Sequence, residues 1–217
     1  MNKCNSALTV LALFSIVLAA WGYSVLPPVV ASHWNAAGLA DGFSSKETSF
    51  LFPVLVVVII ILFNWLPKYD PLAHNIEKFG AEWSLFKAVL VAFFIYVQAL
   101  FIAYNLGFTF NFGQLLAPGL AALFYAVGVM LAKAKRNYFI GIRTPWTLAS
   151  DLVWDKTHSI GAKLFKAVAV AVLVIGILLP QQAIWVLLGL LGGVVAYLLY
   201  FSYREWKKEG RKRKPRA

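Results

Sequence analysis

The sequence has few of the residues that bind metals or perform catalysis. Among 217 residues there are one cysteine, three histidines and nine acidic residues. The lone Cys4 excludes an intrachain disulfide. His33, His74 and His158 lie far apart in the sequence, no His-Glu-x-x-His motif occurs, and no other catalytic constellation is present. We therefore expect no metal site, no cofactor and no enzymatic activity.

Charge is also scarce, and it is absent from long stretches of the chain. Only 13% of the residues are charged, whereas 61% are hydrophobic. Crossing ~30 Å of hydrocarbon takes a helix of ~20 mostly apolar residues. The uncharged runs 7–25 and 50–66 each fit one crossing, and the runs 88–132 and 167–203 each fit two. The sequence thus predicts an all-α integral membrane protein with six transmembrane helices.

The expected spans contain almost no ionisable side chains. Ion-coupled transporters place such groups along their transport path, so their scarcity argues against that class. Lys87 lies close enough to the end of a span to snorkel towards the interface. Gln98 and Asn105 are the main polar groups inside the expected bundle, and a role in handling a small solute or a lipid is an alternative that would use them.

Cations are distributed unevenly about the expected membrane. If the N-terminus is cytoplasmic, 19 of the 20 Lys and Arg residues face the cytoplasm, and only Lys46 lies outside. Loops rich in Lys and Arg stay in the cytoplasm, so we expect a multi-pass cell-membrane protein with both termini inside. A cleaved signal peptide is the alternative for residues 7–25, but the apolar run continues to span length.

The loop 26–49 is expected to be extracellular and is too long to be a simple turn. Four of its side chains are candidate contacts for an extracellular ligand or partner: His33, Trp34, Asn35 and Asp41. Alternatively, His33 and Asp41 brace the loop against itself. In that case Trp34 and Phe43 anchor it at the lipid headgroups.

The loop 133–162 is expected to be cytoplasmic and to carry a short amphipathic helix near residues 145–158. Thr144 before Pro145 is a typical helix start. Trp154 falls in the middle of the polar face of this helix, which indicates that the bundle or a partner covers that face. Eight residues form the candidate inner-loop site: Asn137, Gly141, Arg143, Thr144, Ser150, Asp151, Trp154 and His158.

Arg143 has three interpretations within this inner loop. It can pair with Asp151 or Asp155 as part of a structural connector, or it can bind an anionic partner. It can also act with one of these aspartates on a lipid headgroup, which is the alternative that makes the protein a membrane enzyme. The basic tail 204–217 is expected to contact anionic membrane lipids, with an acidic protein as the alternative partner. We expect no direct binding to nucleic acid.

Both loops resemble known families. The outer loop resembles the DUF1648 family in Leu26-Pro27, His33-Trp34-Asn35, Gly38, Asp41-Gly42 and Lys46. The inner loop resembles the SdpI family in Asn137, Gly141-Ile142-Arg143-Thr144, Thr147, Ser150, Trp154, His158 and Gly161. The resemblance implies a two-helix DUF1648-like part at 1–75 and a four-helix SdpI-like part at 76–217. It further implies immunity to, or sensing of, a secreted antimicrobial peptide toxin, and for some members a relay to a cytoplasmic regulator.

Overall fold

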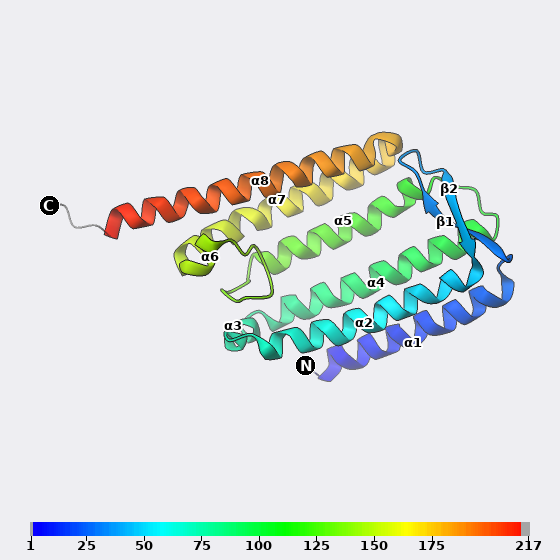
Figure 1. Cartoon of the computed structure of the whole chain (residues 1–217), viewed down its shortest axis with the longest axis horizontal. Coiled ribbons are helices and arrows are strands. Elements are labelled where there is room, and N and C mark those ends of the chain that lie inside the picture. The colour runs from blue at the N-terminus through cyan, green and yellow to red at the C-terminus, as the bar shows by residue number, and fades with distance from the viewer. Residues whose placement is uncertain (1, 214–217) are drawn as a thin grey trace.

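Six long helices dominate the computed structural model, which describes residues 2–213 (Figure 1). They are α1 (Asn2–Val25), α2 (Leu51–Trp65), α4 (Gly80–Asn105), α5 (Phe112–Leu131), α7 (Asp151–Leu178) and α8 (Pro180–Arg213). The short 3₁₀ helices η1 (Lys46–Phe50) and η2 (Leu66–Tyr69) extend α2 at its two ends. Six helical segments are long and apolar enough to cross a membrane, which confirms the predicted number of spans.

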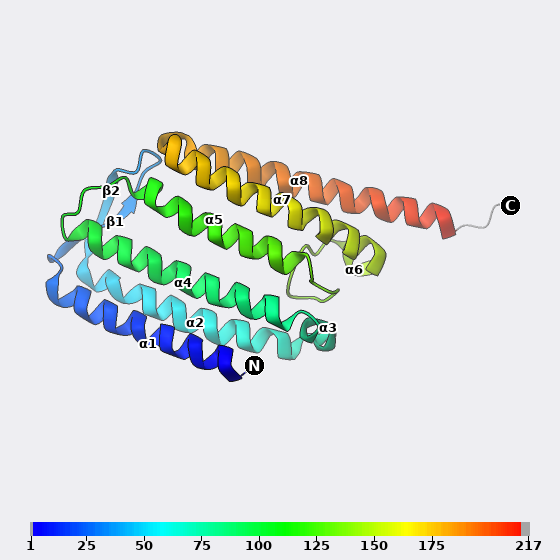
Figure 2. The same ribbon diagram turned by 180° about the vertical axis from the view of Figure 1, so that it is seen from behind.

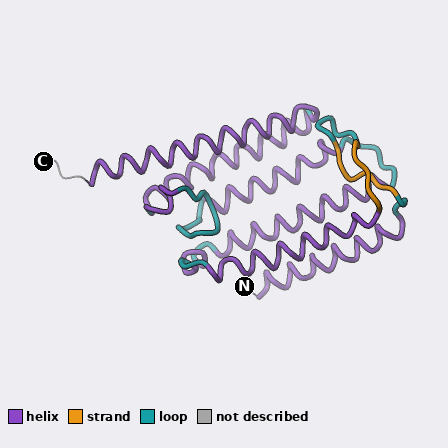
Figure 3. The backbone as a smooth tube through the Cα atoms, in the orientation of Figure 1, coloured by secondary structure: helices purple, strands orange, loops and turns teal. Residues whose placement is uncertain are grey.

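The outer loop contains an element that the sequence reading did not predict. Residues Val29–Trp34 (β1) and Ala40–Ser45 (β2) pair as an antiparallel hairpin, drawn in orange in Figure 3. The fold is therefore helical except for this hairpin. Buried and exposed residues alternate over only a few positions of β1, because the pairing register with β2 shifts between Ala31 and Trp34. A pattern of this length is too weak to predict a strand from sequence.

The hairpin is bound to the end of α4 by both apolar and polar contacts. Val30 and Ala31 are buried, and Val30 packs with Phe101 and Ile102 of α4. The Asn105 side chain forms two hydrogen bonds with the backbone of β1. Its Oδ1 accepts from the Ala31 N–H at 2.6 Å, and its Nδ2 donates to the Ala31 carbonyl at 3.0 Å. These paired backbone contacts hold the hairpin in one position over the bundle.

The helices form two groups of three that meet where α4 packs on α5. In the first group α1, α2 and α4 contact one another, and in the second α7 packs between α5 and α8. Figure 1 and the reverse view in Figure 2 show α5 between α4 and α7. The predicted second part, 76–217, includes α4, yet α4 packs with α1 and α2 as well as with α5. The division between residues 75 and 76 therefore stays a prediction.

Polar groups inside the two helix groups are used for packing. Ser15 Oγ donates to Gln98 Oε1 at 2.7 Å, and Gln98 Nε2 donates back to the Ser15 carbonyl at 3.0 Å. Both side chains are fully buried. Gln98 and Asn105 are therefore occupied by contacts within the chain, which removes the polar groups that the alternative role in handling a solute would use.

The predicted single helix over residues 145–158 was wrong. The chain forms a one-turn helix, α6 (Pro145–Ala149), and then starts α7 at Asp151. Ser150 separates them because its backbone is extended (φ −150°, ψ 126°) and its Oγ accepts from the Val153 N–H at 3.3 Å, an N-cap for α7. Asp151 therefore lies in the first turn of α7, where its negative charge interacts favourably with the helix dipole. The fifth span begins well before the predicted residue 167.

The connections alternate between the two ends of the bundle. The end that carries the hairpin, the 106–111 loop and the α7–α8 turn is called the hairpin end below. The opposite end, called the basic end, holds the chain start, α3 (Ala73–Glu77) and the connection from α5 to α7. With 34 residues, α8 is ~51 Å long and projects beyond the other helices at the basic end (Figure 1). The last four residues of the expected tail, 214–217, lie outside the described residues.

Candidate functional site

The hairpin braces itself through residues that were predicted as ligand contacts. His33 Nδ1 and Asp41 Oδ1 are 2.5 Å apart, and both side chains remain largely exposed. Asn35 Oδ1 accepts from the backbone N–H of Ala37 and Leu39, at 2.9 and 3.2 Å. Asn35 therefore shapes the turn of the hairpin. The expectation that His33 and Asp41 brace the loop is confirmed, and their exposure keeps them accessible to a ligand.

Trp34 packs within the protein at the hairpin end. Its ring stacks on Phe112 with centroids 3.8 Å apart and an angle of 14°, and it meets Tyr104 edge-on at 5.2 Å. The alternative that Trp34 anchors at the headgroups did not foresee this stacking on Phe112, the first residue of α5, and an interfacial position of the ring stays a prediction. Phe43, the other expected anchor, is exposed. Trp34 thereby fixes the hairpin to α5 as Asn105 fixes it to α4.

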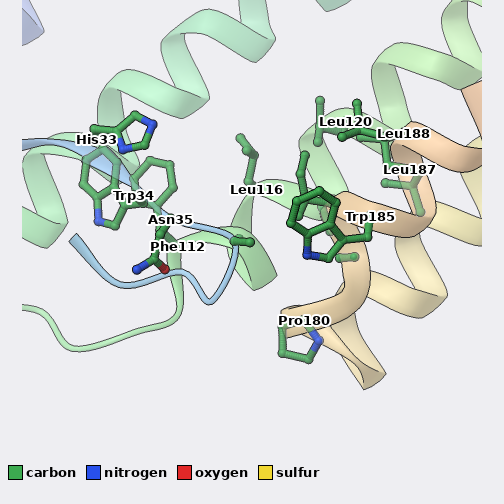
Figure 4. Close-up of a pocket in the computed structure, with 16 residues that line it drawn as sticks. His33, Trp34, Asn35, Phe112, Leu116, Leu120, Pro180, Trp185, Leu187 and Leu188 are labelled. Atoms are coloured by element: carbon green, nitrogen blue, oxygen red, sulfur yellow. The ribbon is translucent and has the colours of Figure 1, made fainter. Parts of the chain in front are cut away.

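A cavity of about 400 Å³ lies between the hairpin and the start of α8 (Figure 4). His33, Trp34 and Asn35 line one side, and Pro180, Trp185 and Leu188 line the other. Leu116 of α5 lies between these two groups in Figure 4, and Leu120 lies next to Leu188. The lining is mainly apolar, with a polar edge from the hairpin. Such a concave apolar surface with few polar groups is typical of a ligand site.

The sequence reading missed the residues that α5 and α8 contribute to this cavity. Phe112 and Trp185 each follow a turn that was predicted to lie on the same side of the membrane as the outer loop. Aromatic residues close behind such turns are a signal that could have indicated them. Their approach to the hairpin could not be read from sequence, because it depends on how the two helix groups pack.

At the basic end, Asn137 organises the connection between α5 and α6. It is fully buried, its Oδ1 accepts from the N–H groups of Phe139 and Ile140, and its Nδ2 donates to the carbonyls of Lys135 and Ile140. Asp70 also accepts from the Tyr138 N–H at 2.8 Å. Asn137 thus holds the loop from within, and Asp70 ties it to the first helix group.

Trp154 and His158 form the buried centre of the inner loop. Their rings stack 3.9 Å apart, and both side chains are almost fully buried. Trp154 Nε1 donates to the Ala134 carbonyl at 2.9 Å, and His158 Nε2 accepts from the Ile142 N–H at 3.0 Å. His158 Nδ1 lies 2.9 Å from the Trp154 carbonyl, so a neutral ring with its proton on Nδ1 satisfies both contacts. The expectation that Trp154 is covered is confirmed, and the bundle itself provides the cover.

Gly141 makes this arrangement possible. Its φ of +111° lies in the region that favours glycine. A Cβ at this position would overlap His158 Nε2, the atom that accepts from Ile142. Gly141 is therefore required both by its backbone conformation and by its close approach to the histidine.

The predicted pairing of Arg143 with an aspartate was wrong. Arg143 Nη1 donates to the Tyr138 carbonyl at 2.6 Å. Asp151 instead pairs with Arg136 at 2.7 Å, and Asp155 pairs with Lys135 at 3.3 Å. The lipid-modifying alternative needs Arg143 and one of these acids at a single headgroup, and other cations already engage both acids. Arg143 is left exposed at the basic end.

The inner loop also contacts the extension of α8. The Thr144 side chain caps α6 by accepting from the Thr147 N–H at 3.1 Å, and its hydroxyl donates to Ser202 Oγ at 3.2 Å. Ser150 Oγ donates to Glu209 Oε2 at 2.5 Å. The capping prediction for Thr144 is confirmed. These contacts join the inner-loop residues to the part of α8 that projects from the bundle.

The inner-loop candidates therefore have mainly structural contacts. The expected loop 133–162 is shorter than predicted, since α7 takes in its second half. No group of three His, Cys, Asp or Glu side chains within residues 2–213 lies close enough together to hold a metal ion. Among the described parts of the chain, the hairpin-end cavity is where predicted ligand contacts line a concave surface.

Comparison with known proteins agrees with both loop patterns. Residues 133–202 match the SdpI/YfhL protein family, and residues 10–57 match a domain of unknown function, DUF1648. A Bacillus subtilis (strain 168) protein named "Immunity protein SdpI" is 23% identical over 205 residues, which cover 94% of this chain and 92% of that protein. No solved structure matches the chain. The chain thus joins six described helices that are long and apolar enough to cross a membrane with an SdpI/YfhL-family segment at 133–202 and a DUF1648 segment at 10–57.

Proposed function

We propose that the protein protects its own cell from a secreted antimicrobial peptide by binding that peptide at the outer face of the cell membrane. The orientation follows from the charge of the connecting segments: with a cytoplasmic N-terminus, 19 of the 20 Lys and Arg residues of the sequence are expected on the cytoplasmic side, and Lys46 alone lies in the outer loop. Under the positive-inside rule the hairpin end faces outward and both termini face the cytoplasm. The name of the Bacillus subtilis relative supports the immunity role.

The observation that carries this proposal is the apolar cavity at the hairpin end. Membrane-active peptides are rich in apolar side chains, and the cavity offers them Trp185 and Leu188 on α8 and the stacked pair Trp34 and Phe112. Trp185 is 67% exposed, so its large ring is available for contact. The exposed His33–Asp41 pair at the edge can orient a polar group of the peptide. Binding, with no chemical step, is sufficient for protection.

The test is expression of the chain in a Bacillus subtilis strain that lacks its own SdpI. The cells are exposed to culture supernatants of the parent strain and of the bacterium from which this chain comes. We expect the full chain to raise survival against at least one supernatant. Full killing by both supernatants, at a membrane level verified by immunoblot, would contradict the immunity role.

Two tryptophan variants test whether the peptide binds at the hairpin-end cavity. Trp185→Ala should weaken protection about tenfold in the toxin dose, because it removes an exposed ring from the cavity. Trp65→Ala is the matched control, since Trp65 is 58% exposed but lies on α2 near the basic end. Equal effects of the two changes would indicate that the cavity is not the contact site.

A relay to a cytoplasmic regulator is the finer part of the proposal. The α7 and α8 helices run from the cavity to the basic end, where the inner loop contacts α8 through Ser202 and Glu209. The exposed Arg143 and Trp206 then offer a surface for an acidic cytoplasmic partner. Arg143→Ala should leave protection intact while it lowers recovery of that partner in a crosslinking pull-down from toxin-treated cells. Loss of protection in this variant would instead indicate a structural role.

A further inference from the structure

A second cavity lies at the basic end, on the opposite side of the membrane from the proposed peptide site. It has a volume of about 230 Å³ and is enclosed by α2, α3, α4 and the start of α1. Phe63 and Trp83 line it with aromatic rings whose centroids are 5.1 Å apart. Lys68, Glu77 and Lys87 line it with charge. We call it the lysine cavity, after Lys68 and Lys87.

Lys87 is the main polar feature of this cavity. It was expected to snorkel to the interface, but its side chain is buried, with a residue exposure of 7%. Its Nζ donates to Asn64 Oδ1 of α2 at 2.6 Å. Lys87 follows the first residue of α4 by seven positions, which places its Cα ~10 Å along the helix. Ionisable groups held within a membrane-spanning segment are costly and usually mark a functional site.

Trp83 provides a second, independent indication of a ligand. It also has 7% exposure, and its Nε1 is buried without a hydrogen-bond partner among the described residues. A buried N–H normally has an acceptor, because a buried donor without its hydrogen bond costs about 1–3 kcal/mol of stability. Trp83 and Lys87 lie four residues apart on α4, on the same face of the helix, and both line the cavity. One helix face thus carries a buried lysine and an indole whose N–H has no partner among the described residues, and both residues line the cavity.

The charges select the class of ligand. Lys68 at the surface and Lys87 inside, opposed by Glu77, give the lining a formal net charge of +1. A phosphodiester carries one negative charge and accepts strong hydrogen bonds from ammonium groups. The rings of Phe63 and Trp83 provide an apolar surface beside it. Phospholipids combine a phosphodiester group with apolar chains, and they surround the membrane-spanning helices of this protein.

We propose that the lysine cavity binds the phosphodiester group of a phospholipid from the leaflet at the basic end. In this site Lys87 neutralises the phosphate, Lys68 contacts it from the surface and Trp83 donates its N–H. The lipid would fill the space between α2 and α4 and connect the first helix group to its membrane. This site lies apart from the hairpin-end cavity and does not depend on the proposed immunity function.

The experiment is native mass spectrometry of the full chain, purified in detergent and titrated with phosphatidylglycerol. Lys87→Met should weaken the first lipid-binding constant about 30-fold, since it removes a buried charge contact. Lys68→Met should weaken it about threefold, because that lysine is exposed. The control is Lys163→Met on α7, which removes an exposed cation outside the cavity and should leave the constant unchanged.

Two further measurements separate the outcomes. The melting temperature of each variant in detergent tests its folding, and if Lys87→Met is unfolded, Lys68→Met together with Trp83→Phe decides the question. Equal lipid binding in these variants and in Lys163→Met would overturn the proposal. Glycerol 3-phosphate is titrated in parallel. If it binds as tightly as the lipid with the same lysine dependence, a free phosphate ester is the ligand and the lipid assignment is overturned.

Discussion

The contact between Gly141 and His158 gives a prediction that two glycines test together. Gly141 has φ +111° and Gly107 has φ +94°, so alanine strains the backbone at both positions by about 1–2 kcal/mol. The surroundings differ. A Cβ at Gly141 would overlap His158 Nε2, whereas a Cβ at Gly107 has no heavy atom within 4 Å.

Gly141→Ala should therefore lower the free energy of unfolding more than Gly107→Ala. Forcing an extra methyl into a packed site adds about 1–3 kcal/mol, and displacing His158 also endangers its 3.0 Å bond to the Ile142 N–H. We expect a total loss of about 2–5 kcal/mol for Gly141→Ala and about 1–2 kcal/mol for Gly107→Ala. The measurement is unfolding of the purified protein by SDS in mixed micelles, followed by tryptophan fluorescence.

A double variant isolates the steric part of this effect. His158→Ala removes the ring that the new methyl would meet, so Gly141→Ala in that background should cost no more than the backbone strain measured at Gly107. The reasoning would be refuted if Gly141→Ala and Gly107→Ala were equally destabilising. It would also be refuted if the cost of Gly141→Ala stayed the same in the His158→Ala background.

Three more predictions follow from other contacts of the bundle. Gln98→Leu should destabilise the protein by about 1 kcal/mol in the same SDS assay, and adding Ser15→Ala should cost less than the sum of the single changes, since the two side chains share one contact. Asn105→Leu should speed amide hydrogen exchange in the hairpin about tenfold, which corresponds to ~1.4 kcal/mol, because Ala31 loses both of its hydrogen bonds to the Asn105 side chain. Unchanged exchange would contradict the role of Asn105 in holding the hairpin. In a cysteine-free background, an impermeant maleimide should label Leu39→Cys but not Gly210→Cys in intact cells, and the reverse pattern would overturn the orientation.

Several parts of the fold were predictable because they depend on local chemistry. Both uncharged runs that fit two crossings turn at local turn signals, one between Asn105 and Phe112 and one at Pro180. Turn formers and a proline act on the adjacent backbone, so their effect can be read from sequence. The N-cap at Thr144 is predictable for the same reason.

The errors concern one local signal that was overlooked and several contacts between separate segments. Ser150 ended one helix and began another because its hydroxyl capped α7, and periodicity alone joined the two helices into one. One of the three interpretations paired Arg143 with Asp151 or Asp155, but Arg136 and Lys135 form those ion pairs instead. One alternative placed Trp34 at the headgroups, and its stacking on Phe112 of α5 was not foreseen. The Ser150 cap is a local signal, whereas the partners of the aspartates and of Trp34 are visible only when the loops and helices have been packed together.

The sequence by itself determined the number of membrane crossings and the separation of cations to one end. Both depend on the transfer of side chains and charges between water and lipid, which is nearly additive along the chain. Only the tertiary structure decided the hairpin, the closure of a cavity between that hairpin and α8, and the burial of Lys87 beside Asn64. Those features arise from contacts between segments distant in sequence, whose free energy depends on shape and distance and so cannot be summed residue by residue.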